Sequence, residues 1–204
     1  MLVKVYPQNP NPRHLRRIAE TLERGGIIIY PTDTVYAMGC DIKASRAIER
    51  IADFKGQNPL NPDLSFIFHD MSQLSDYTII RDNNIFKLMK RNLPGPFTFI
   101  VQANNQIPRM FKNRKKTVGI RIPGNTVTLE IVRELGRPLI TTSIHDNEGI
   151  GEYSTDPELI HERYGKLVDL VVDGGYGRNE PSTVVDCTGD EIIIVRQGLG
   201  ELEF

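Results

Sequence analysis

Two hydrophobic patterns alternate along the chain, and together they predict its secondary structure. Short runs of β-branched and aromatic residues are typical of buried strands, whereas hydrophobic residues at three- and four-residue spacing are typical of helices with one buried face. The short runs predict about nine strands, at Leu2–Tyr6, Ile27–Tyr30, Leu64–Phe68, Phe97–Gln102, Val118–Ile122, Leu139–Ser143, Leu167–Val172, Thr183–Cys187 and Ile192–Arg196. The longer pattern predicts about five helices, one from Asn11-Pro12 to Gly25-Gly26 and others at Ser45–Phe54, Asn83–Arg91, Val127–Leu135 and Pro157–Tyr164.

This alternation predicts a single α/β domain over residues 1–204, with a twisted, open, mixed sheet and flanking helices. Longer loops are expected at Gln57–Asp63, Asn104–Lys116 and Asp146–Thr155. Because strands and helices continue to alternate on both sides of each loop, none of them is interpreted as a linker between domains.

Composition adds few constraints. The 204 residues include 25 basic and 26 acidic side chains, and the net charge of −1 does not by itself indicate a nucleic-acid partner. Cys40 and Cys187 are far apart in the sequence and lie in no metal-binding spacing, so neither a disulfide framework nor a protein-held metal is expected. No apolar run is long enough for a signal peptide or a membrane span, and we expect a cytoplasmic protein.

Polar side chains follow the apolar strand Ile27–Tyr30, where Thr32, Thr34 and Tyr36 lie within a Pro-Thr-Asp-Thr-Val-Tyr segment. Ligands of open α/β sheets lie at the carboxyl ends of strands, so these hydroxyls are candidate ligand contacts. A polar turn that satisfies its own hydroxyls explains the segment equally well. No phosphate-binding loop, dinucleotide fingerprint, serine nucleophile elbow or zinc-protease motif occurs, so a bound nucleotide would be held by another device.

A second group of hydroxyls ends the strand Leu139–Ser143, where Thr142 and Ser143 precede His145. Hydroxyls at the end of an apolar strand lose packing, which favours a role in binding, although His145 alone is more typical of a surface or capping residue. Ser182 begins a later strand in the same way.

Three cations are candidate anion ligands. Strand alternation puts Arg121 on the same face as Gly119, which leaves room for a carboxylate or phosphate that arginine can hold with two hydrogen bonds. Lys55 ends an amphipathic helix and Arg196 ends a strand. For each of them a solvated surface position is the competing interpretation.

Taken in order, these segments resemble the YrdC/YciO family, and the YciO branch in particular. The resemblance extends from about Leu2 to Gly198 and rests on Pro31–Tyr36 with Gly39–Asp41, Lys55-Gly56, Leu93–Phe99, Gly119–Pro123, Thr142-Ser143, Asp173–Gly175, Ser182–Val184 and Val195–Gly198. It implies a concave, positively charged sheet face. It also implies a synthase that condenses L-threonine, bicarbonate and ATP into threonylcarbamoyl-AMP and pyrophosphate, for threonylcarbamoyl modification of tRNA.

The resemblance also implies roles for individual residues. Lys55 and Ser143 would be catalytic, and the nucleotide would contact Lys55, Gln57, His145 and Arg196. The substrate would contact Thr32, Thr34, Tyr36, Arg121, Thr142 and Ser182. Mg²⁺ would be held mainly by the phosphates of ATP and by water.

Two positions depart from the synthase pattern and leave other functions open. Synthases carry Lys-x-Arg where this chain has Lys55-Gly56-Gln57, and Ser-x-Asn where it has Ser143-Ile144-His145. One alternative is a noncatalytic relative that binds double-stranded RNA or tRNA in translation or ribosome function. Another is an enzyme of the same fold that uses a different acid or forms a different acyl adenylate.

A basic cluster predicts the RNA contact. Lys112, Arg114, Lys115 and Lys116 lie in one predicted loop beside the strand of Arg121. Cations beside a cleft suit contact with backbone phosphates, although a solvated loop is the usual explanation for such a run.

Overall fold

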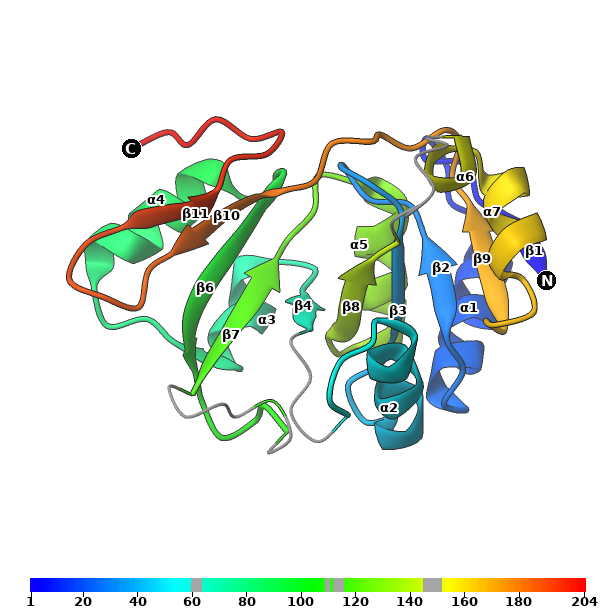
Figure 1. The fold of residues 1–204 in the computed structure, drawn as a ribbon, viewed down its shortest axis with the longest axis horizontal. Helices are drawn as coiled ribbons and strands as arrows, with labels where there is room; N and C mark the ends of the chain where they lie inside the picture. Colours follow the sequence, from blue (N-terminus) through cyan, green and yellow to red (C-terminus); the bar gives the residue numbers. More distant parts are fainter. Residues whose placement is uncertain (60–63, 109–110, 112–115, 145–151) are drawn as a thin grey trace.

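A single mixed sheet of eleven strands runs through the computed structural model, which describes residues 1–59, 64–108, 111, 116–144 and 152–204 (Figure 1). The strands are β1 (Leu2–Lys4), β2 (Ile28–Tyr30), β3 (Ala37–Asp41), β4 (Ser65–Ile67), β5 (Thr78–Ile79), β6 (Phe97–Ala103), β7 (Thr117–Arg121), β8 (Leu139–Ser143), β9 (Leu170–Asp173), β10 (Thr183–Asp186) and β11 (Ile193–Arg196). Their order across the sheet is β1-β9-β2-β3-β8-β4-β7-β6-β10-β11, and β5 pairs with β6. Parallel and antiparallel pairs both occur, which confirms the predicted α/β class.

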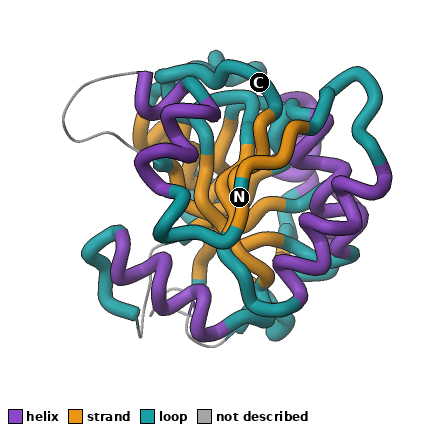
Figure 2. Tube along the Cα trace, turned by 90° about the vertical axis from the view of Figure 1, so that its right-hand side faces the viewer, coloured by secondary structure: helices purple, strands orange, loops and turns teal. Residues whose placement is uncertain are grey.

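The helices lie on both sides of the strands (Figure 2). They are α1 (Pro12–Glu23), α2 (Ser45–Phe54), α3 (Met71–Ser75), α4 (Asn83–Asn92), α5 (Thr126–Leu135), α6 (Glu152–Thr155) and α7 (Pro157–Tyr164). The caps follow from the sequence: Asn11 accepts a hydrogen bond from the Arg13 amide with Pro12 in the first turn, and Gly136 ends α5 with a φ of 71°.

The sequence missed one strand that matters for the site. No strand is predicted at Ala37–Asp41, yet this segment forms β3 in the centre of the sheet, antiparallel to β2 and β8. Its glycine and aspartate are poor strand formers, and the pairing with two neighbouring strands overrides that preference. The short elements β5, α3 and α6 also carried too few residues to show a period.

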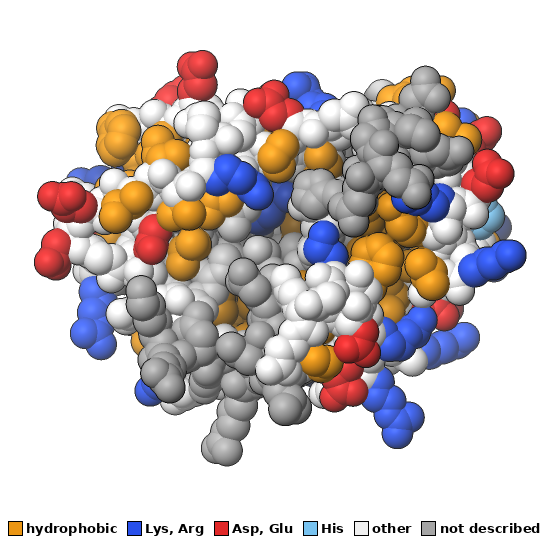
Figure 3. Space-filling view, in the orientation of Figure 1, with side chains coloured by type: hydrophobic (Ala, Val, Ile, Leu, Met, Phe, Trp, Pro, Cys, Tyr) orange, Lys and Arg blue, Asp and Glu red, His pale blue; other side chains and the backbone are white. Residues whose placement is uncertain are grey.

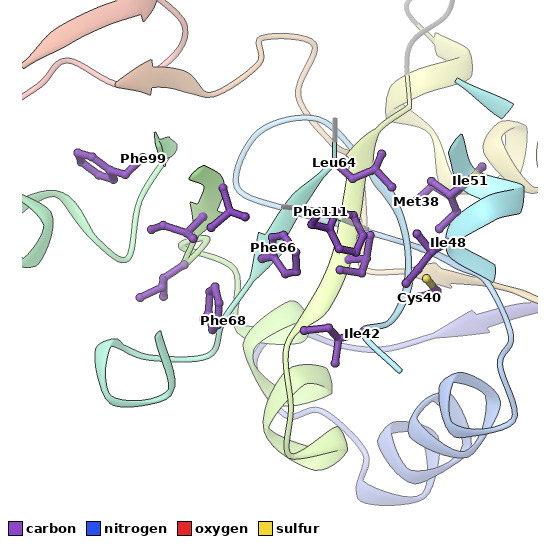
Figure 4. Close-up of a cluster of buried hydrophobic side chains, with 14 of the residues drawn as sticks. Met38, Cys40, Ile42, Ile48, Ile51, Leu64, Phe66, Phe68, Phe99 and Phe111 are labelled. Atoms are coloured by element: carbon purple, nitrogen blue, oxygen red, sulfur yellow. The ribbon is translucent and has the colours of Figure 1, made fainter. Parts of the chain in front are cut away.

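Residues directly opposite each other on neighbouring strands point to the same face of a sheet. One such row is fully buried and forms the core with α2, α4 and α7: Cys40, Ile140, Phe66, Ile120, Phe99 and Val185. Figure 4 shows Cys40, Phe66 and Phe99 of this row together with Ile48 and Ile51 of α2.

The row on the opposite face is buried under helices at one end and lines a cleft at the other. It consists of Ile28, Gly39, Thr141, Ser65, Gly119, Ile100 and Asp186. Ile28 belongs to a second core with α1 and α5, whereas every residue from Thr141 to Asp186 lines a cleft. The same sheet face is therefore a helix-covered core on one half and a ligand-accessible surface on the other.

No helix in the described ranges is both long and apolar enough to cross a membrane.

The helix layer should determine stability independently of the cleft. Ile18 of α1 is fully buried in the second core, so Ile18→Ala should lower the free energy of unfolding by about 2–5 kcal/mol, measured by urea denaturation. The neighbouring Arg17 is exposed, and Arg17→Ala should change that free energy by less than about 0.5 kcal/mol. Equal effects of the two substitutions would contradict this assignment of the core.

Candidate functional site

A cleft of about 620 Å³ opens over β8, β4, β7, β6, β10 and β11, a volume typical of small-molecule sites. Hydroxyl side chains dominate its lining: Ser65, Thr98, Thr117, Thr141, Thr142, Ser143, Ser182 and Thr188. Arg121 and Arg196 also line it, with Asp186 as the one carboxylate among the described lining residues. Lys and Arg side chains gather around the hollow over the central strands (Figure 3).

Arg121 lies almost fully buried at the base of this cleft, with 5% of its surface exposed. Its Nη2 donates to Asp33 Oδ1 at 2.9 Å and to Thr34 Oγ1 at 3.0 Å. Its Nε–H is buried and has no partner among the described residues. Burial lowers the pKa of Arg121, and the Asp33 carboxylate opposes that shift. A buried donor without a partner is costly, so this atom favours an incoming acceptor.

Gly119 provides the space beside Arg121 that strand alternation predicted. A Cβ at this position would lie 2.8 Å from Ser65 Oγ and 3.2 Å from Thr98 Cγ2. Any side chain here would therefore fill the cleft floor between β4 and β6.

The Pro-Thr-Asp-Thr turn satisfies its own hydroxyls, and its Thr32 and Thr34 support the cleft without being among its lining residues. Thr32 Oγ1 donates to the Val35 carbonyl oxygen at 2.6 Å and accepts from the Thr34 amide at 3.0 Å, so it organises the turn. Thr34 contacts Arg121. Asp33, which was not singled out, holds the arginine with one oxygen and the Gly124 amide with the other, at 2.8 Å.

Arg196 lines the cleft, and Lys55 lies beside it through a hydrogen bond to the lining residue Ser143. Arg196 Nη2 donates to the Ser182 carbonyl oxygen at 2.8 Å, and Ser182 Oγ lies 2.8 Å from Thr98 Oγ1. Lys55, the C-cap of α2, donates from Nζ to the Ser143 carbonyl oxygen at 3.4 Å. Within the described residues neither cation has a carboxylate partner. Both charges are therefore available to a ligand.

The other predicted residues are placed as follows. Tyr36 lies away from the cleft lining, and its hydroxyl donates to the Gly175 carbonyl oxygen at 2.7 Å. Gln57 follows α2 directly after Gly56, with its amide donating to the Ala52 carbonyl oxygen. Lys116 is exposed just before β7. The remaining four lie outside the described residues: Lys112, Arg114, Lys115 and His145.

Sequence reasoning missed several cleft residues whose side chains are individually unremarkable, namely Ser65, Thr98, Thr117, Asp186 and Thr188. Strand alternation could have shown which residues of each single strand share a face. Only the order of the strands in the sheet shows that β4, β6 and β10 lie on the same side of the molecule as Arg121.

The arrangement suits a ligand with several negative charges, because cations and hydroxyl donors outnumber the single carboxylate. In the part of the chain that the structure describes, no group of three or more His, Cys, Asp or Glu side chains could hold a metal ion.

The family model Sua5_yciO_yrdC, described as "Telomere recombination", matches residues 20–198. The chain belongs to this Sua5/YciO/YrdC family. Protein YciO of Escherichia coli strain K12 is 38% identical over 200 residues, which are 98% of this chain and 96% of the relative. The threonylcarbamoyl-AMP synthase of Vibrio vulnificus strain YJ016 is 28% identical, over 91% of this chain and 98% of the synthase. The resemblance inferred from the sequence motifs is thus confirmed.

Solved structures agree with the fold of this Sua5/YciO/YrdC chain. The crystal structure of E. coli YciO superposes with a TM-score of 0.89 at 37% identity, covering 100% of this chain and 98% of that one. Sua5 of P. abyssi, crystallised with L-threonine, gives a TM-score of 0.83 at 24% identity. The match covers 97% of this chain and 57% of the P. abyssi chain, so it concerns one part of that longer protein.

Anion binding should depend on pH through Lys55. Burial lowers the pKa of Lys55, so its positive charge is lost at a lower pH than that of an ordinary lysine. We expect the affinity for ATP, measured by calorimetry above neutral pH where its phosphates are fully ionised, to fall as the pH rises through this lowered pKa. In Lys55→Arg the charge persists, and the fall should disappear. The same fall in the variant would assign the pH dependence to another group.

Proposed function

We propose that this chain is a threonylcarbamoyl-AMP synthase, which condenses L-threonine, bicarbonate and ATP. The observation that carries the proposal is the pairing of three cations, Arg121 and Arg196 in the cleft and Lys55 beside it. Arg121 is neutralised by Asp33, whereas among the described residues Lys55 and Arg196 contact carbonyl and hydroxyl oxygens and no carboxylate. The synthase relatives add support, since those of V. vulnificus and Bacillus subtilis are 28% and 30% identical to this chain.

The cleft offers separate places for the two kinds of anion. A triphosphate carries several charges and needs cations whose charge is not already balanced, which are Lys55 and Arg196. A single carboxylate needs donors in a fixed geometry more than net charge, and Arg121 provides them. Its Nε–H is free among the described residues while Asp33 holds the rest of the group in place. The L-threonine bound in the P. abyssi Sua5 structure supports an amino-acid site in this fold.

The reaction requires two steps. The threonine amine attacks the bicarbonate carbon with loss of water, which gives a carbamate. A carbamate oxygen then attacks the α-phosphorus of ATP, and pyrophosphate leaves. Lys55 and Arg196 would neutralise charge that builds up on the phosphates, and Ser143 and Thr142 would donate hydrogen bonds to ligand oxygens, so that positioning and electrostatics supply most of the rate.

Mg²⁺ would accompany the nucleotide. With Asp186 the one carboxylate among the described lining residues, the ion would be held mainly by phosphate oxygens and water, as is usual for Mg²⁺.

Lys55 should be required for product formation. Purified protein incubated with ATP, Mg²⁺, L-threonine and labelled bicarbonate should yield threonylcarbamoyl-AMP and pyrophosphate. Lys55→Ala should slow this by at least about 10-fold, because a charged hydrogen bond contributes about 1.5–3 kcal/mol. The exposed Lys90 of α4 offers the control Lys90→Ala, which should keep the wild-type rate. Equal rates in all three proteins would remove Lys55 from the catalytic site.

An absence of product with ATP still bound would instead favour the RNA-binding relative. Three of the four cations predicted to contact RNA lie outside the described residues, and the fourth, Lys116, is exposed. The decisive follow-up is then the salt dependence of RNA binding before and after all four are replaced by glutamine.

Gln57→Arg should accelerate the same reaction. Synthases of the family carry an arginine at this position, so the substitution restores a guanidinium beside Lys55 and should raise the rate by about 10- to 100-fold. Gln102→Arg adds the same charge at an exposed position of β6 and should leave the rate unchanged. A rate in Gln57→Arg at or below the wild-type value would mean that the missing guanidinium does not limit catalysis.

A further inference from the structure

The buried Tyr30 determines whether the cleft residue Thr141 donates or accepts a hydrogen bond. Tyr30 of β2 is fully buried, and its hydroxyl lies 2.6 Å from Thr141 Oγ1 of β8, two strands away. Thr141 lines the cleft and is 3% exposed. Neither Tyr30 nor Thr141 was among the residues predicted to form the site.

The tyrosine reaches Thr141 because the intervening strand carries a glycine. Gly39 of β3 lies directly opposite Thr141 in the sheet. A Cβ at Gly39 would lie 2.5 Å from the Ile140 carbonyl oxygen and 3.1 Å from the Tyr30 hydroxyl. The Tyr30 phenol therefore crosses β3 at Gly39, where the absence of a side chain leaves room for it. The strand register fixes the position of Gly39 opposite Thr141.

The direction of this hydrogen bond follows from acidity. A phenol is the stronger acid of the two hydroxyls, so Tyr30 donates and Thr141 accepts. Burial raises the pKa of Tyr30, which keeps the phenol protonated and able to donate. A threonine hydroxyl has one proton of its own, and no acceptor for the Thr141 proton occurs among the described residues. That proton is left for a ligand in the cleft.

Thr141 lies on the same sheet face as Arg121, whose strand β7 is two strands away. Ser65 lies opposite Thr141 on one side and Gly119 on the other, and Arg121 follows two residues later on the same face. The buried Nε–H of Arg121 has no partner among the described residues, and Arg121 lies close enough to Tyr30 to influence its pKa. Both groups therefore offer a proton to a ligand, and one of the two acceptor lone pairs of Thr141 Oγ1 is already used by Tyr30.

We propose that Tyr30 is a positioning residue that holds Thr141 as a donor, so that this corner of the cleft selects a ligand carboxylate over the corresponding carboxamide. The proposal rests on the proposed function in one respect, namely that the ligand carboxylate belongs to the amino-acid substrate. A carboxylate accepts from both donors, whereas a carboxamide brings an NH₂ group that would face a donor without a partner. Without the Tyr30 hydroxyl, Thr141 is free to rotate and accept.

The test is a ratio of affinities measured by calorimetry with L-threonine and L-threoninamide. We expect the wild type to bind the acid about 10- to 100-fold more tightly than the amide. Tyr30→Phe and Thr141→Val should each reduce this ratio about 10-fold, and the double variant should reduce it no further, because the two hydroxyls act as one unit. Thr141→Ser keeps the hydroxyl and should keep the wild-type ratio.

Tyr77→Phe is the matched control, since it removes one tyrosine hydroxyl from a partly buried position beside Phe68, outside the cleft lining. Its ratio should equal that of the wild type. Thermal melting of every variant establishes that it is folded.

The outcomes separate this inference from the proposed function. Tight binding of L-threonine by the wild type, with the same acid-to-amide ratio in Tyr30→Phe and Thr141→Val, overturns the inference alone. Weaker ATP binding in these two variants with an unchanged ratio also overturns it, and assigns the corner to a phosphate. No binding of L-threonine by the wild type overturns both.

Discussion

The buried ion pair between Arg121 and Asp33 is the contact on which the site depends. Taking a guanidinium out of water costs several kcal/mol, and the interior accepts it only because Asp33 and Thr34 share one of its nitrogens. The same carboxylate binds the Gly124 amide just before α5. Asp33 thus ties the turn after β2 to the connection between β7 and α5, and the charge of Arg121 is held in place by the elements that build the core.

The sheet face that carries Arg121 has two uses. On the side of β2, the face is apolar and packs on α1 and α5. Beyond β8, the residues in the same row become Ser65, Gly119 and Asp186, which line the cleft. One strand can contribute to both the core and the cleft, because the helices cover only part of this sheet face. Alternate residues of the strand point to this face along its whole length, under a helix in one part and into the cleft in another. Leu139 of β8 therefore packs in the core while Ser143, four residues later on the same strand, lines the cleft.

Local patterns predicted the α/β class, the amphipathic helices and the pairing of Gly119 with Arg121 on one face, since each of these depends on residues near in sequence. The motif order predicted the family. What sequence could not provide was the strand order: β4, β7 and β6 are adjacent through pairings between distant residues, and those pairings bring Ser65 and Thr98 to Gly119. For the same reason Asp33 was passed over, because its partner is eighty-eight positions away. The predicted roles of Lys55, Arg196 and the other site residues stay predictions.

The net charge of the cleft depends on which of its cations are already paired. Arg121 contributes little net charge because Asp33 balances it, so among the described residues the uncompensated positive charge in and beside the cleft comes from Arg196 and Lys55. Asp186 lies in the same cleft and reduces that sum, although Thr188 donates to one of its oxygens from both its amide and its hydroxyl. For the synthase proposed above, two uncompensated cations among the described residues are few for a triphosphate, so we propose that Mg²⁺ supplies much of the remaining neutralisation. Because position 57 is a glutamine, the same proposal predicts a stronger dependence on the metal than in a relative with an arginine there.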